Sequence, residues 1–214
     1  FCITLMMNYS EIAKDAVASA YSVTHSARRH EMVSRQIMGG PFTIIVVQGE
    51  QGLAQQVAQY LELLESRWSR FLPDSEISRL NCAEGRVLNV SAETMLLVQQ
   101  LIASWQISDG IFDPTTLPLT LANGYAASHV DATNVTTLPA SAQWPGDIEG
   151  IEVNESAKTI QFPLGTTLDP GGLGKGLAAD LGVEFALKHG ATGVLVSANG
   201  DVRVSGEAPD GDAW

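Results

Sequence analysis

The sequence is poor in cysteine and in basic residues, and it contains no long apolar run. Its 214 residues include only Cys2 and Cys82, too few for a disulfide framework or for a zinc site of clustered thiolates. We expect Cys82 to be a free, partly buried thiol. No apolar run approaches the roughly 20 residues that a membrane-spanning helix requires. A transmembrane segment is therefore not expected.

Positive charge is also scarce. Twelve Lys and Arg stand against 24 Asp and Glu, which gives a formal net charge of −12. No basic cluster offers a stripe that could follow a phosphate backbone, so nucleic acid is not an expected partner. The same charge disfavours non-specific binding to anionic lipid surfaces, but it does not exclude a local pocket for an anionic cofactor.

Size and composition indicate one globular domain over residues 1–214. The chain is 45% hydrophobic and 17% charged, which is ordinary for a globular protein with one well-buried core. Residues 1–7 are apolar but lack the basic flank and cleavage pattern of a complete signal peptide. The sequence therefore leaves the compartment open.

A strand and two helices are predicted in the first half of the chain. Residues 42–47 are mostly β-branched and predict a strand, entered through a tight Gly-Pro turn at Gly40-Pro41. Residues 52–70 predict a helix, and a second helix begins near Ser91, a good N-cap, and stops before Gly110. The side chains expected to face the core are Leu53, Val57, Tyr60, Leu61, Leu64 and Trp68 in the first helix and Met95, Val98, Ile102 and Trp105 in the second.

The second half contains a glycine-rich segment, residues 171–176, between a predicted strand at 159–162 and a helix that ends at Gly190. Residues 193–205 predict a hairpin around Asn199-Gly200, which favours a type I′ turn. Leu177, Leu181 and Phe185 are expected on one face of that helix. Because helices and hairpin strands mix without a steady βαβ rhythm, we predict an α+β fold of mixed helices and antiparallel strands.

The glycine-rich segment carries the clearest indication of function. Glycines let the backbone approach a ligand closely, the following helix N-terminus supplies free N–H groups and a positive dipole, and Lys175 adds a charge. We therefore expect an anionic ligand here. A Walker A loop is excluded, because Gly176 follows Lys175 where that motif needs Ser or Thr.

The residues alone leave two other interpretations of this segment open. Residues 174–179 fit the loose Gly-x-Gly-x-x-Gly/Ala pattern of dinucleotide-binding folds, which would predict a Rossmann oxidoreductase that binds NAD(P)H. Pro163 and Pro170 leave little room for the strand that should precede such a motif. A purely structural glycine-rich turn is the other alternative.

Residues 169–180 resemble a signature of the ApbE family of FAD-dependent FMN transferases, in which an Asp leads a glycine-rich loop, then Lys-Gly, then a closing Asp. Four further segments resemble blocks of that family in the same order, which identifies the chain as a member. The first is Met38-Gly39, before the first strand, and the second is residues 71–81, similar to an aromatic-x-Pro-x-Ser block that ends in Ser-Arg-Leu-Asn. The third is residues 110–119, similar to Gly-x-Phe-Asp-Pro-Thr-x-x-Pro-Leu. The fourth is residues 197–206, similar to a Gly-Gly-Asp-(Ile/Val)-Arg hairpin.

The resemblance implies an ApbE-like flavin transferase fold and a set of site residues. The Gly172 carbonyl is implied as a ligand of Mg²⁺, which prefers several oxygen ligands and would need partners from elsewhere. Contacts to FAD are implied for Met38, Phe71, Ile111, Phe112, Asp113, Asp169 and Lys175.

Four of the implied FAD contacts have a physical reason and a plain alternative. Phe71 can stack on a flavin or adenine ring, or it can be a core aromatic that ends a helix. Asp113 and Asp169 can accept hydrogen bonds from ring or ribose donors, or they can cap turns. Lys175 can neutralise a pyrophosphate oxygen, or it can be a solvated lysine.

The reaction implied by the resemblance is attack by a threonine hydroxyl of an acceptor flavoprotein on the FMN phosphoryl group of FAD, with release of AMP. Mg²⁺ would offset charge on the pyrophosphate, and Lys175 would help to position it. No catalytic residue is assigned. The alternative is a FAD-binding protein without transferase activity.

The resemblance also implies a departure from the family. Members continue beyond the position of Trp214, and that later part supplies an Asp and a Thr for the metal and a His implicated in catalysis. We expect that part to be missing from these 214 residues, and turnover to be impaired or absent. The histidines of this chain do not align with the catalytic one and are expected on the surface or in the core: His25, His30, His129 and His189.

Overall fold

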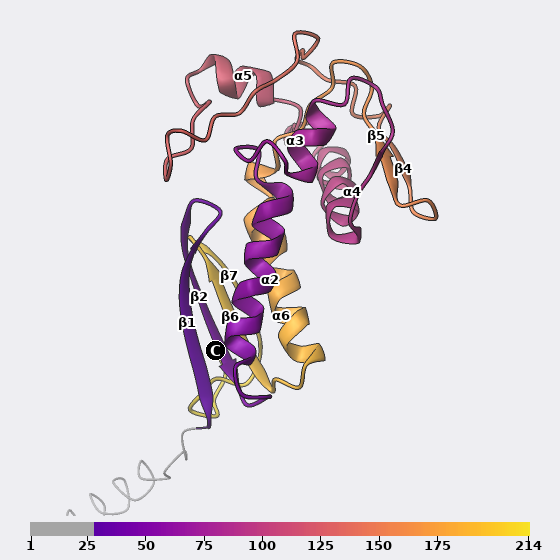
Figure 1. Ribbon diagram of the computed structural model, residues 1–214. Coiled ribbons are helices and arrows are strands. Elements are labelled where there is room, and N and C mark those ends of the chain that lie inside the picture. The colour runs from indigo at the N-terminus through magenta and orange to yellow at the C-terminus, as the bar shows by residue number, and fades with distance from the viewer. Residues whose placement is uncertain (1–27) are drawn as a thin grey trace, which may run out of the picture.

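The computed structural model describes residues 28–214. In this part of the chain a four-stranded sheet packs against two long helices (Figure 1). The strand order is β1-β2-β6-β7, and each neighbouring pair is antiparallel. Helices α2 and α6 lie side by side on one face of the sheet and run in opposite directions (Figure 1). The bounds are β1 (His30–Ile37), β2 (Gly40–Val47), α2 (Leu53–Trp68), α6 (Gly174–Lys188), β6 (Gly193–Ala198) and β7 (Asp201–Gly206).

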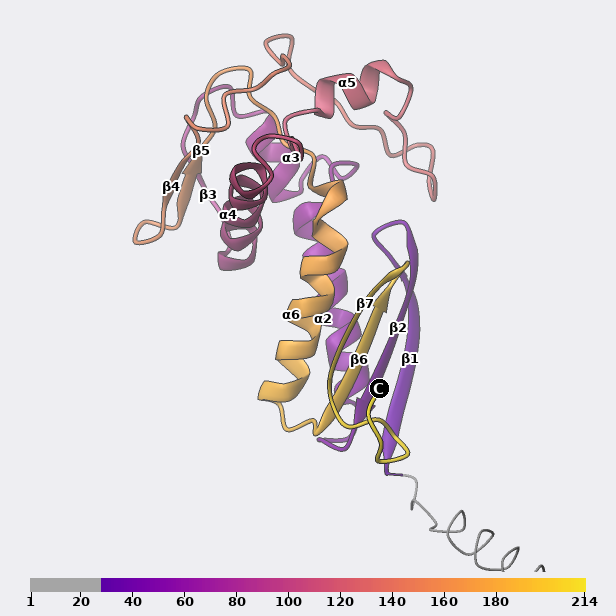
Figure 2. The same cartoon turned by 180° about the vertical axis from the view of Figure 1, so that it is seen from behind.

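The remaining elements gather at the end of this sheet and helix pair where α2 finishes and α6 starts (Figure 2). They include a small antiparallel sheet of order β3-β5-β4. The bounds are α3 (Glu76–Asn81), β3 (Leu88–Asn89), α4 (Ala92–Ile107), α5 (Leu117–Ala122), β4 (Glu152–Asn154), β5 (Thr159–Gln161) and the 3₁₀ turn η1 (Pro170–Gly172). The predicted α+β class is confirmed.

Two tight hairpin turns lie next to each other at that end of the large sheet. Asn199 and Gly200 both have positive φ, at 51° and 112°, and they join β6 to β7 as predicted. Met38 and Gly39 likewise have positive φ and join β1 to β2. The predicted Gly40-Pro41 turn is therefore wrong: both residues already belong to β2, and the preceding strand β1 was not predicted. Most side chains of strand β1 are exposed, and apolar and polar residues do not alternate along it, so it shows no strand pattern.

Helix α2 matches its prediction closely. Its buried face includes all the predicted core residues except Tyr60, which is partly buried and stacks on Phe185 with ring centroids 5.0 Å apart. The helix begins after Gly52, whose φ is 85°. Ser91 caps α4 as predicted, because its Oγ accepts from the Thr94 N–H at 3.2 Å.

Helix α6 has the predicted apolar face, and that face packs against the core. Leu177, Leu181 and Phe185 are only partly buried, and the fully buried side belongs to small residues: Ala178, Ala179, Gly182, Val183 and Ala186. A Cβ on Gly182 would lie 3.2 Å from Leu61 Cδ2 and 3.5 Å from Val196 Cγ2. Small residues on this side let α6 fit closely against both α2 and the sheet, while the large ones pack beside the contact.

Three further expectations can be compared with the structure. Cys82 is a free thiol, as predicted, but it is exposed rather than partly buried. No helix within residues 28–214 has both the length and the apolar character needed to cross a membrane. The apolar start at residues 1–7, together with Cys2 and His25, lies outside the described residues.

Candidate functional site

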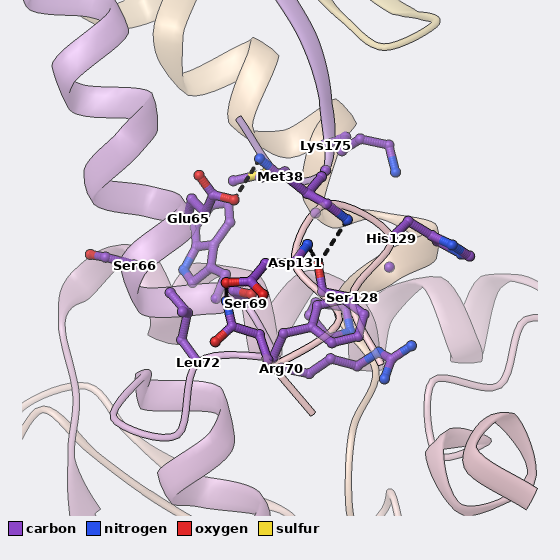
Figure 3. Close-up of a pocket in the computed structure, with 18 of the residues that line it drawn as sticks. Met38, Glu65, Ser66, Ser69, Arg70, Leu72, Ser128, His129, Asp131 and Lys175 are labelled. Carbon is purple, nitrogen blue, oxygen red and sulfur yellow. Dashed lines mark hydrogen bonds between the residues drawn. The ribbon is translucent and has the colours of Figure 1, made fainter. Parts of the chain in front are cut away.

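A pocket of about 560 Å³ opens where the two hairpin turns meet the end of α2 and the start of α6. Its size is that of a small-molecule or cofactor site. A further wall of the pocket comes from the segment that follows α5. We call this segment the overhanging loop (residues 125–136). Figure 3 shows side chains from these elements converging on one space. The site is thus assembled from five separate stretches of the chain.

Four of the seven predicted FAD contacts line this pocket: Met38, Phe71, Asp169 and Lys175. The other three and the predicted metal ligand do not. Ile111 is 92% exposed. Phe112 lies against Gly172, where an added Cβ would come 2.9 Å from the ring.

Met38 occupies the first position of the β1–β2 turn and is fixed there by Glu65. The Met38 N–H donates to Glu65 Oε1 at 2.8 Å, a bond drawn as a dashed line in Figure 3. Burial raises the pKa of Glu65, the charge of Glu62 adds to the rise, and the Met38 N–H opposes it. The Glu65 carboxylate near the end of α2 therefore holds the β1–β2 turn at the pocket wall, although burial disfavours its charged form.

Replacing Glu65 with glutamine should make the stability of the protein less dependent on pH. The amide keeps an oxygen for the Met38 N–H but carries no charge. Because the folded-state pKa of Glu65 is raised, its stabilising contribution is complete below the unfolded pKa of about 4.3 and is lost as pH rises through the folded pKa. At pH 7.5 the free energy of unfolding of E65Q should therefore be at least that of the wild type, and higher by up to about 1 kcal/mol. At pH 4 the two proteins should be equally stable.

Urea unfolding at the two pH values measures this difference. Glu152→Gln, a change of an exposed carboxylate on β4, is the control and should alter neither value. A Glu65→Gln protein that is less stable by the same amount at both pH values would contradict the prediction. The loss would then come from the changed shape or hydrogen bonding of the side chain and not from its charge.

Lys175 lies in the first turn of α6, partly buried at the pocket wall. Within residues 28–214 its ammonium group has neither a hydrogen-bond acceptor nor a carboxylate partner. The N-terminus of this 15-residue helix adds free N–H groups and a positive dipole end. This corner of the pocket is therefore suited to an anion.

Asp169 and Asp113 both occupy the capping roles that the sequence left open as alternatives. Asp169 Oδ1 accepts from the Gly171 N–H at 2.8 Å, and its Oδ2 lies 3.4 Å from Arg70 Nε. Asp113 Oδ1 accepts from the backbone and hydroxyl of Thr115. A contact of either carboxylate to FAD stays a prediction.

Arg70 is the principal pocket residue that sequence reasoning missed. Its guanidinium lies 4.1 Å from the centre of the Phe71 ring and beside Asp169. Burial lowers the pKa of Arg70, and Asp169 partly offsets that shift. An arginine next to the aromatic block was visible in the sequence, but nothing there indicates its distant partners.

The overhanging loop supplies five further lining residues that were not predicted: Ser128, His129, Val130, Asp131 and Asn134. His129 was expected either on the surface or in the core, and it is exposed and lines the pocket. His30 and His189 are also exposed, and His189 stacks on Phe185. No sequence motif marks this loop.

The role of the Gly172 carbonyl as a Mg²⁺ ligand stays a prediction. No cluster of three or more His, Cys, Asp or Glu side chains suited to a metal occurs within residues 28–214. Gly172 does not line the pocket, although Gly171 and Gly174 on either side of it do. Its carbonyl is a single oxygen donor, and Mg²⁺ would need further ligands from FAD, from water or from outside this range.

The Rossmann alternative is ruled out by topology. That fold needs a parallel strand leading into Gly174, but both sheets within residues 28–214 pair antiparallel. The residues before Gly174 form the 3₁₀ turn η1 instead. Gly174 to Ala179 are themselves part of α6.

Comparison with known proteins points to one family. The profile of the ApbE family matches residues 38–214. A FAD:protein FMN transferase of Chlamydia pneumoniae is 27% identical over 180 residues, which cover 80% of this chain and 55% of that protein. The chain therefore spans just over half the length of this relative.

Solved structures share the fold. The flavin transferase ApbE of Vibrio cholerae superposes with a TM-score of 0.70 at 20% identity and covers 87% of this chain and 62% of that one. The flavinyl transferase ApbE of Pseudomonas stutzeri gives a TM-score of 0.71 at 22% identity, with 87% of this chain and 61% of that one covered.

Proposed function

Since this chain belongs to the ApbE family, we propose that its pocket binds FAD and serves the transfer of FMN from FAD to an acceptor flavoprotein. The observation that carries the proposal is the ammonium of Lys175, which has no partner among residues 28–214 and lies in a pocket that also contains the start of α6. A pyrophosphate is the part of FAD that such a corner would hold.

The other predicted contacts fit different parts of the same ligand. One face of the Phe71 ring is occupied by Arg70, so a flavin or adenine ring would stack on the opposite face. The Met38–Gly39 turn offers backbone groups and an apolar side chain at the pocket wall. Ile111, Phe112 and Asp113 do not line the pocket, and their contact with FAD stays a prediction.

The proposed reaction joins a threonine oxygen of the acceptor to the FMN phosphorus of FAD. The bond from that phosphorus to the oxygen of the AMP moiety breaks, AMP leaves, and the hydroxyl proton is released. Positioning and charge stabilisation dominate such transfers, and Lys175 would provide both at the pyrophosphate. Mg²⁺ would supply further charge stabilisation when bound, and the Gly172 carbonyl is the ligand that we propose for it within residues 28–214.

Incubating the protein with FAD, Mg²⁺ and threonine-containing flavoproteins tests the proposal. Transfer would make the acceptor fluorescent on a denaturing gel and release AMP in equal amount. Threonine-to-alanine acceptors and FMN in place of FAD should give no label, and EDTA should abolish labelling. FAD binding without label would favour the FAD-binding alternative, and no FAD binding would overturn both.

A further inference from the structure

The guanidinium of Arg70 connects three segments of the pocket. Its Nε faces Asp169 at 3.4 Å, its Nη1 donates to Thr136 Oγ1 at 2.7 Å, and its Nη2 donates to the Tyr125 carbonyl at 2.9 Å. The side chain is only 11% exposed. All three nitrogens are therefore engaged, each by a different acceptor.

Two of these acceptors are the two ends of the overhanging loop. An isolated bridge between Ala127 and Val135 closes the base of the loop, and the Thr136 N–H donates to the Ala126 carbonyl at 2.9 Å. At the tip, Ser128 Oγ accepts from the N–H groups of Val130 and Asp131. The loop is thus an ordered hairpin, anchored at its base by Arg70.

We propose that Arg70 is a positioning residue for FAD binding, which fixes the overhanging loop, the Asp169 carboxylate and the Phe71 ring in their places around the pocket. This inference rests on the proposed function. The loop tip reaches the pocket through Ser128, His129 and Asp131, so the position of its base decides the shape of that wall. Asp169 leads directly into the turn before Lys175.

The positive charge of Arg70 would not by itself fix the overhanging loop, Asp169 and Phe71 in place. A lysine could face Asp169, but its single ammonium cannot match three acceptors that the planar guanidinium meets at once. Stacking of the guanidinium on Phe71 would also be lost. Arginine and lysine should therefore differ strongly here, although both are cations.

Arg70→Lys should weaken FAD binding by about tenfold or more and raise amide hydrogen exchange in the overhanging loop of the ligand-free protein. In the labelling reaction the KM for FAD should rise more than kcat falls. Arg67→Lys is the matched control, since Arg67 lies one turn earlier, pairs with Glu93 at 2.6 Å and does not line the pocket. It should leave FAD affinity and loop exchange unchanged.

Thr136→Val tests the contact of Arg70 with the overhanging loop separately from its contacts with Asp169 and Phe71. It removes one acceptor of Arg70 with little change in shape, so it should raise loop exchange and weaken FAD binding less than Arg70→Lys does. In the double variant the two effects should not add, because both remove the same contact. Arg70→Ala should regain FAD affinity when millimolar guanidinium is supplied.

Two results would overturn the proposal: Arg70→Lys with wild-type affinity for FAD, or affinity lost while loop exchange stays at the wild-type rate. A wild-type protein that does not bind FAD would refute the proposed function and, with it, a role for Arg70 in FAD binding. The exchange measurement on ligand-free protein would still decide whether Arg70 anchors the loop.

Discussion

Replacing Lys175 with methionine should weaken FAD binding by about ten- to a hundredfold, since a hydrogen bond to a charged group contributes about 1.5–3 kcal/mol. Methionine keeps most of the apolar stem and removes only the ammonium. Riboflavin, which has no phosphate, should bind the variant as it binds the wild type. Flavin fluorescence titrations with both ligands measure the two effects separately.

Lys188→Met is the control for this variant. Lys188 is at the other end of α6, is exposed and pairs with Glu184 at 3.3 Å. Its loss should leave FAD affinity unchanged. The Lys175 contribution should also shrink as salt concentration rises, because ions screen a partly exposed charge. Equal losses of riboflavin and FAD affinity in Lys175→Met would show that the lysine shapes the pocket rather than binding phosphate.

Replacing Asn81 with leucine should lower the free energy of unfolding by about 2–5 kcal/mol. Asn81 is 3% exposed; its Nδ2 donates to the Leu168 carbonyl at 2.9 Å, and its Oδ1 accepts from the Leu168 N–H at 2.8 Å. Leucine has a similar volume but makes neither bond, which leaves two buried backbone groups unsatisfied at about 1–3 kcal/mol each.

Urea unfolding measures this loss, and Asn89→Leu, a change at an exposed position of β3, should stay within about 0.5 kcal/mol of the wild type. The Asn81 variant should also bind FAD less well if it is still folded, because Leu168 directly precedes Asp169. An Asn81→Leu protein with wild-type stability would mean that water or a backbone shift satisfies Leu168.

The sequence predicted those parts of the fold that local pattern controls. Helix α2 shows one apolar face over four turns, and Asn199-Gly200 suits the positive φ values of its turn. The fully buried side of α6 was not predicted, because its contact depends on close approach to α2 and the sheet, which favours Gly182 over Leu181. The need for close approach comes from α2 and the sheet, so it cannot be seen in the apolar periodicity of α6 itself.

The same distinction applies to the site. Met38, Phe71, Asp169 and Lys175 were identified through motifs, and the structure brings them to one pocket. Glu65 and Arg70 were missed because their partners are distant in sequence: Met38 is 27 residues from Glu65, and Thr136 is 66 residues from Arg70. Such pairs exist only after tertiary folding, so composition and spacing cannot reveal them.

The pocket draws its walls from both hairpin turns, from the ends of α2 and α6 and from the overhanging loop. No short stretch of the chain contains it, so an unfolded chain has no remnant of the site. A ligand held there binds the native state alone, and the folding equilibrium moves with ligand concentration. At a hundred times its Kd, such a ligand adds about 2.7 kcal/mol to the free energy of unfolding. If that ligand is a flavin, its concentration would raise the stability of the folded chain as well as the occupancy of the pocket.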